Sequence, residues 1–192
     1  MWGGEGPANL GSIEVSYVSM ARFIRDYSFA SWAPFWYLGF PFHVFYTPLL
    51  PFLEFILNKF YQIPLWQTYR LLTGASYILG PVGLFFLAWQ LSKNIVGGAI
   101  SAFLYSVGPT VFYFLVPEVS QDRFSYEFFD PRRFTILVRW GEGPHIFSLM
   151  FLPWGGVFFV KYLRSNKFGY LILSSIFLGL TALSNALGLN AA

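Results

Sequence analysis

Four long apolar segments, separated by two short polar turns and one long polar loop, are the strongest constraint that this sequence places on its fold. Each comes close to the length that a helix needs to cross a bilayer, about 20 residues. Charged residues make up 11% of the chain, against about 25% in soluble globular domains. We therefore expect an all-α integral membrane protein with about four transmembrane helices, at residues 71–91, 95–116, 146–163 and 170–189.

Residues 1–70, which precede the first of these spans, are expected to form an outer loop that lies against the membrane. In the stretch 13–24, apolar residues recur at helical spacing, and Glu14 and Arg22 fall on other faces. This pattern predicts an amphipathic helix along the membrane surface.

Residues 44–61 are apolar but carry Pro48, Pro51 and Glu54. We interpret them as a juxtamembrane or re-entrant helix and not as a full span. An ionisable group at membrane depth usually faces a cavity or a partner, whereas Glu54 on a helix at the interface would face water.

The basic residues of the short turns predict the orientation of the chain. Lys93 lies in one turn, and Lys161, Arg164 and Lys167 flank another, with no acid beside them. Cytoplasmic loops are enriched in Lys and Arg, so both turns are placed in the cytoplasm. The first 70 residues and the second loop, 117–145, then face the outer side together. If residues 44–61 crossed fully, residues 1–43 and the loop 117–145 would face opposite sides.

The second outer loop holds five of the nine acids and four of the twelve bases of the chain. Its final seven residues run from Arg139 to His145 and include Glu142. We interpret the earlier part, Glu118 to Arg133, as a solvated excursion. The net charge of +3 follows from the membrane topology, and no nucleic-acid partner is expected.

Acids from both loops are candidates for chemistry at the outer surface. Glu14 and Glu142 could act as a general base or hold a divalent cation, and Arg22, Arg139 and His145 could neutralise phosphate oxygens. Each has a structural alternative. Glu14 could be a solvated surface charge. Glu142 and His145 could simply mark the start of a helix, where an acid favours the helix dipole.

The order of these features resembles the outer loops of GT-C-type polytopic glycosyltransferases. Glu14 opens an amphipathic segment, Arg22 follows eight positions later, an aromatic turn covers residues 32–39, and Tyr46-Thr47-Pro48 begins the next helix. The catalytic subunit of oligosaccharyltransferase shows a comparable order, with a second outer loop that ends in an acidic motif. Archaeal and bacterial membrane proteins labelled 6-pyruvoyl-tetrahydropterin synthase-related are similar as well.

The resemblance implies transfer of a sugar from a polyprenyl-phosphate-linked donor to an acceptor, at the outer face of an archaeal or bacterial plasma membrane. It implies roles for Glu14 as base or metal-positioning acid, Glu142 as second-loop acid, and Arg22, Arg139 and His145 as donor-binding groups. A divalent cation, Mg²⁺ or Mn²⁺, would be the cofactor. We expect residues 1–192 to form one membrane module of a longer protein, in contact with membrane lipid and with the remainder of that protein.

The alternative is a non-catalytic polytopic membrane protein. It could be a transporter, a lipid-handling protein, or a scaffold derived from a GT-C enzyme. A coupled transporter would need acids or bases near the middle of several spans, and apart from Glu54 the apolar segments have almost none.

Overall fold

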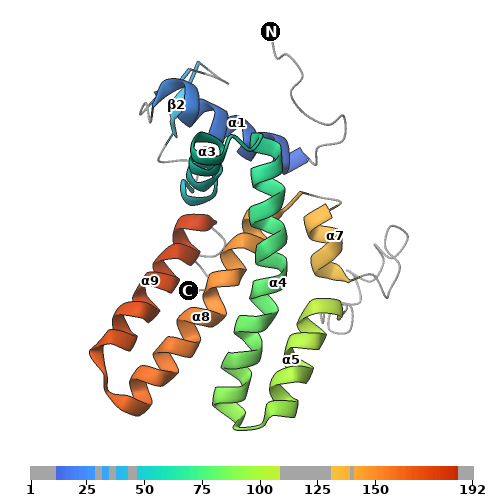
Figure 1. Cartoon of the computed structure of the whole chain (residues 1–192), viewed down its shortest axis with the longest axis vertical. Coiled ribbons are helices and arrows are strands. Elements are labelled where there is room, and N and C mark those ends of the chain that lie inside the picture. The colour runs from blue at the N-terminus through green and yellow to red at the C-terminus, as the bar shows by residue number, and fades with distance from the viewer. Residues whose placement is uncertain are drawn as a thin grey trace.

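The computed structural model describes residues 12–28, 32–34, 38–42, 47–108, 131–138 and 141–185. They are predominantly helical, as predicted. The elements are α1 (Ser12–Tyr27), β1 (Trp32–Ala33), β2 (Phe40–Pro41), α3 (Leu49–Tyr61), α4 (Leu65–Ser92), α5 (Ile95–Val107), α7 (Arg132–Val138), α8 (Gly143–Ser165) and α9 (Phe168–Ser184). In Figure 1, α4, α8 and α9 run along the long axis of the molecule, and α1, α3 and the strands gather at one end.

Two helices, α4 and α8, are long and apolar enough to cross a membrane. With 28 and 23 residues, they measure roughly 42 and 35 Å at 1.5 Å per residue. Helix α4 begins six residues before the predicted span, directly after the extended Pro64. Helix α8 begins three residues before its predicted span, with Pro144 in its first turn, where the missing N–H of proline costs nothing.

The other two apolar helices are shorter than the predicted spans. Helix α5 ends at Val107, and Gly108 is extended. Pro109 follows in the sequence, and the residue before a proline is driven out of the helical region by steric clash. Helix α9 ends at Ser184. The predicted continuations, 109–116 and 186–189, lie outside the described residues. The four-span topology stays a prediction.

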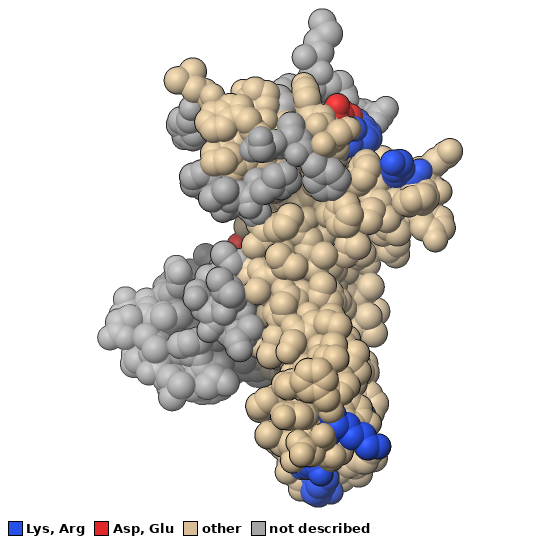
Figure 2. Space-filling view, turned by 90° about the vertical axis from the view of Figure 1, so that its left-hand side faces the viewer, with Lys and Arg blue, Asp and Glu red and all other residues tan. Residues whose placement is uncertain are grey.

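The two short turns that connect α4 to α5 and α8 to α9 lie at the same end of the molecule (Figure 1). Lys93 and Asn166 end α4 and α8 in the left-handed conformation, and the Asn94 side chain accepts hydrogen bonds from the first backbone N–H groups of α5. Lys and Arg side chains on the face shown in Figure 2 lie toward the two ends of the molecule, and the described surface between them shows none. This arrangement agrees with the predicted grouping of the basic turns.

The opposite end is organised by α1, whose apolar face is buried as the helical spacing predicts. Met20, Phe23 and Ile24 pack with Ala33 and Phe42 of the hairpin region in one core cluster. The aromatic stretch predicted as a turn contains the antiparallel pair β1–β2, in which Trp32 faces Pro41 and Ala33 faces Phe40.

Gly39, directly before β2, has a φ of +100°. A Cβ atom there would lie 2.8 Å from the Ala33 carbonyl oxygen. Only glycine meets both constraints easily.

Helix α3 begins after Pro48 and buries Leu50, Pro51 and Glu54. Its 13 residues span roughly 20 Å, less than the ~30 Å of a bilayer core. The prediction that residues 44–61 do not form a full spanning helix therefore fits the described part of this segment.

Candidate functional site

Four helices meet near the first turns of α4, at the end of the molecule where α1 and α3 lie (Figure 1). Tyr17 of α1, Leu50 of α3, Tyr69 of α4 and Phe147 of α8 form one buried cluster at this point. The hydroxyl of Thr47 donates to the Ser184 carbonyl oxygen at the end of α9 at 2.9 Å and lies 3.5 Å from the Tyr17 hydroxyl. The N-terminal region therefore contacts α4 and α8 through the buried cluster and α9 through Thr47.

Glu14 is the first-loop acid, and it is held at this junction by Arg70. Arg70 donates from Nε to Oε1 at 2.7 Å and from Nη2 to Oε2 at 3.3 Å, a two-pronged ion pair. The Glu14 residue is only 5% exposed, while the Arg70 side chain is 45% exposed and lies over the Trp66 ring. The alternative that Glu14 is a solvated surface charge is therefore wrong. Because α1 packs across α4, this carboxylate is covered.

Tyr69, the neighbour of Arg70 on α4, holds the segment around the second-loop acid. Its hydroxyl donates to the Gly141 carbonyl oxygen at 2.6 Å and accepts from the Gly143 backbone N–H at 3.1 Å. Glu142 lies between these two glycines, and its own backbone N–H donates to Ile136 of α7. Consecutive residues of α4 therefore contact the first-loop acid and the backbone on both sides of the second-loop acid.

Glu142 is the residue that precedes α8, and its side chain makes no capping hydrogen bond. His145 is half-buried in the first turn, and its Nδ1 atom makes no hydrogen bond to the described residues. The interpretation that these residues mark the start of a helix agrees with their position. It does not exclude a role in binding, because a helix start also favours anions.

Of the two predicted phosphate-binding arginines, only Arg22 lies among the described residues. Arg22 is half-buried on α1, and its Nε atom makes no hydrogen bond to the described residues. Arg139 lies outside the described residues. A second ion pair on α1 joins Arg25 Nε to Asp26 Oδ1 at 2.8 Å, and both side chains are exposed.

Tyr69 and Arg70 were missed by the sequence interpretation, which began the first span at residue 71. The available signal was the position of Arg70 directly before an apolar run, since a base at a membrane edge often has a partner.

Glu54 of α3 is fully buried, and both of its carboxylate oxygens lack a hydrogen-bond partner among the described residues. Burial raises the pKa of Glu54 well above its ordinary value, and the negative charge of Glu14 adds to the shift. The alternative that Glu54 faces water at the interface is wrong. Burial without a hydrogen-bond partner favours the neutral, protonated form of a carboxyl group.

Replacing Glu54 by Gln is expected to stabilise the protein increasingly as the pH rises. The folded protein keeps the Glu54 proton to a higher pH than the unfolded chain, which releases it near the ordinary pKa of 4.5. The stabilising contribution of the raised pKa is therefore fully present below the unfolded pKa. It is lost as the pH rises through the folded pKa. The charged groups facing Glu54 are Glu14 with its partner Arg70, and Tyr69 also lies near it.

Thermal unfolding of both proteins in detergent between about pH 5 and pH 7 measures this effect. The Glu54→Gln variant should gain stability relative to wild type steadily across this range. Glu54→Ala is the control, because it removes the same titrating group but leaves a cavity, and it should be less stable than Glu54→Gln at every pH. A constant difference between wild type and Glu54→Gln would contradict the buried, protonated state.

Arg133 corrects the interpretation of residues Glu118 to Arg133 as a solvated excursion. It is 7% exposed on α7, with its guanidinium 4.7 Å from the Tyr77 ring centre and 4.2 Å from the Tyr105 ring centre. Nη1 donates to the Tyr77 carbonyl oxygen at 3.1 Å. A Cβ atom on Gly80 would lie 3.1 Å from Nη2, so glycine leaves room for this side chain. The Arg133 side chain thus connects α7 to both α4 and α5 through its aromatic neighbours.

The donor set at Glu14 does not fit the divalent cation that the resemblance implies. Both oxygens of Glu14 accept from Arg70, so a metal ion there would lie beside a guanidinium charge. Within the part of the chain that the structure describes, no group of three or more His, Cys, Asp or Glu side chains could hold a metal ion. Comparisons with family models, with curated proteins and with solved structures find no match.

Proposed function

We propose that the chain acts as a GT-C-like glycosyltransferase that moves a sugar from a polyprenyl-phosphate-linked donor to an acceptor at the outer membrane face. One observation carries the proposal. Arg70 and Tyr69, adjacent on α4, bind Glu14 of the first loop and the backbone around Glu142 of the second loop. These are the two acids, one from each loop, that the resemblance to GT-C enzymes names.

Glu14 is the proposed general base in this reaction. The acceptor oxygen bonds to the anomeric carbon of the sugar as the bond from that carbon to the phosphate oxygen breaks. The acceptor proton passes to Glu14, and the polyprenyl phosphate leaves with the electron pair. A carboxylate offers about four lone-pair positions, so Glu14 can accept from Arg70 and from a hydroxyl at once. Arg70 then positions the base.

Arg22, Arg139 and His145 are the proposed contacts of the donor phosphate, since cations and imidazole N–H groups stabilise the developing negative charge. Arg22 and His145 lie on α1 and at the start of α8, and each has a nitrogen without a hydrogen bond to the described residues. We place this end of the molecule on the outer side. Lys93, Lys161, Arg164 and Lys167 at the opposite end favour the cytoplasm.

A second candidate function is a non-catalytic one, and the same ion pair favours it. A carboxylate whose two oxygens both accept from one guanidinium is also what a purely structural link between α1 and α4 requires. In that case the protein would be a scaffold, a lipid-handling protein or a transporter.

The deciding experiment is a transfer assay with the purified protein in lipid nanodiscs. Sugar donors that carry the radiolabel in their polyprenyl phosphate are supplied with candidate hydroxyl acceptors, and released polyprenyl phosphate is counted. We expect release to depend on Glu14 and Glu142. If wild type releases no more lipid phosphate than the variant with both residues replaced by Gln, the catalytic proposal fails and the scaffold is favoured.

A further inference from the structure

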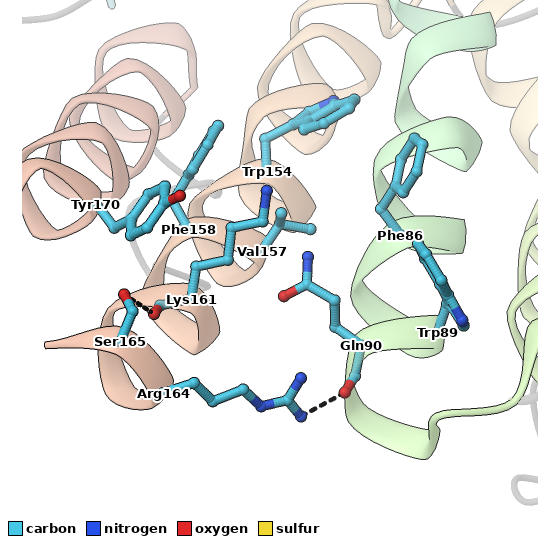
Figure 3. A pocket seen from close by; sticks show the side chains of 10 residues that line it. All are labelled: Phe86, Trp89, Gln90, Trp154, Val157, Phe158, Lys161, Arg164, Ser165 and Tyr170. Carbon is cyan, nitrogen blue, oxygen red and sulfur yellow. Dashed lines mark hydrogen bonds between the residues drawn. The ribbon is translucent and has the colours of Figure 1, made fainter. Parts of the chain in front are cut away.

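A cavity of about 610 Å³ lies at the other end of the molecule from Glu14, between the last turns of α4 and α8 and the start of α9 (Figure 3). Its wall is largely aromatic and comprises Phe86, Trp89, Trp154, Phe158 and Tyr170. At its polar side, Gln90 of α4 faces Lys161 and Arg164 of α8 (Figure 3). An apolar wall thus meets two cations in one cavity.

Among the described residues, neither cation forms an ion pair with an acid. The sequence has no Asp or Glu between residues 55 and 117 or after residue 142. The Lys161 ammonium lies 5.7 Å from the ring centres of both Phe158 and Tyr170, and Arg164 donates one N–H to the Gln90 carbonyl oxygen. A guanidinium has five N–H donors, so Arg164 keeps others for a ligand.

Gln90 adds a second, independent signal. Its side-chain oxygen Oε1 is buried and makes no hydrogen bond to any described residue. A buried acceptor without a partner costs about 1–3 kcal/mol, and a ligand with a hydroxyl donor would remove that cost. The cavity therefore suits a molecule that carries negative charge, a hydroxyl group and an apolar part.

We propose that this cavity binds an anionic glycerophospholipid from the adjacent membrane leaflet. Its phosphate lies between Lys161 and Arg164, a headgroup hydroxyl donates to Gln90 Oε1, and an acyl chain covers the aromatic wall. Basic pockets between membrane helices on the cytoplasmic side are suited to acidic lipid headgroups. A free phosphate ion would leave the aromatic wall uncovered. The proposal rests on the membrane setting given above, and not on sugar transfer.

The test compares three additions to the purified protein in neutral detergent: phosphatidylglycerol, phosphatidylcholine and soluble glycerol phosphate. Thermal unfolding reports binding, because a ligand of the folded state raises Tm. Half of the maximal rise should need on the order of 10-fold less phosphatidylglycerol than phosphatidylcholine, since each cation near an acidic lipid contributes severalfold. Glycerol phosphate at the same concentrations should have no effect.

Two double variants, each with two positive charges fewer than wild type, show whether the preference for phosphatidylglycerol depends on the cavity. Lys161→Gln with Arg164→Gln should abolish the preference for phosphatidylglycerol, whereas Lys93→Gln with Lys167→Gln should keep it, because those residues do not line the cavity. Loss in both variants would overturn the site in favour of diffuse surface charge. An equal response to phosphatidylcholine or to glycerol phosphate would overturn the choice of lipid.

A second readout is the quenching of tryptophan fluorescence by the bound lipid. Phosphatidylglycerol with brominated acyl chains should quench the fluorescence of Trp89 and Trp154, which line the cavity, and replacing both by Phe should remove that part of the quenching. Unchanged quenching in the variant with both replacements would place the lipid elsewhere. Transfer from a polyprenyl-phosphate donor, measured on the Lys161 and Arg164 variant, keeps failure of this site separate from failure of the proposed enzyme.

Discussion

Replacing Glu14 by Gln is expected to lower the rate of sugar transfer from a polyprenyl-phosphate-linked donor by about 10²–10⁴-fold, the usual contribution of a general base. Gln has the same shape, and its amide oxygen can still accept from Arg70, so α1 should stay docked on α4. The amide cannot take up the acceptor proton. Initial rates in nanodiscs, together with Tm, separate this chemical loss from a structural one.

Asp26→Asn is the matched control for Glu14→Gln. Asp26 lies on the same helix, is exposed, and pairs with Arg25. The Asp26→Asn variant should transfer sugar at the wild-type rate. A wild-type rate for Glu14→Gln would remove Glu14 from the mechanism. An equal loss of Tm and activity, reproduced by Arg70→Gln, would support the structural ion pair instead.

Replacing Gly143 by Ala is expected to destabilise the protein by about 3 kcal/mol. A Cβ atom there would overlap the Tyr69 hydroxyl and lie 2.5 Å from the Thr73 methyl carbon. Tyr69 is only 2% exposed and cannot move freely, so its hydrogen bonds to Gly141 and Gly143 should be lost. Thermal unfolding in detergent should show the lower Tm, and transfer activity should fall with it.

Gly74→Ala on α4 controls for the general effect of alanine in a helix. Among the described residues, no atom outside its own helical backbone and chain neighbours lies within 4 Å of a Cβ at Gly74. Stability should therefore stay unchanged or rise by up to about 1 kcal/mol. Tyr69→Phe keeps the ring volume but removes the hydroxyl, and about 1–3 kcal/mol should be lost. If Gly143→Ala were as stable as Gly74→Ala, the close packing of Tyr69 against α8 would be wrong.

Helix positions could be predicted because they follow from local signals. The apolar face of α1 and the basic turns at Lys93 and Lys167 are properties of neighbouring residues. The early end of α5 was also readable, since Gly108 precedes a proline. It was missed because the apolar run continues past that point and hydropathy alone was followed.

The site could be predicted only in part, because its contacts join residues that are far apart in sequence. Glu14 and Arg70 are 56 positions apart, and so are Tyr77 and Arg133. The covered state of Glu14 depends on how α1 crosses α4, which no periodicity specifies. Arg133 was predicted to be solvated because its loop is rich in charge. In the structure it packs against the Tyr77 and Tyr105 rings, and Gly80 leaves room for it.

The most direct test of a shared outer site is the side of the membrane on which the two loops lie. The chain has no cysteine, so single substitutions report without background. Ser28, Val138, Ser92 and Ser165 are all exposed and are each replaced by Cys. With a membrane-impermeant thiol reagent on intact cells, we expect labelling at positions 28 and 138, and labelling at 92 and 165 only after permeabilisation. Positions 28 and 138 reacting from opposite sides would contradict a shared site for Glu14 and Glu142.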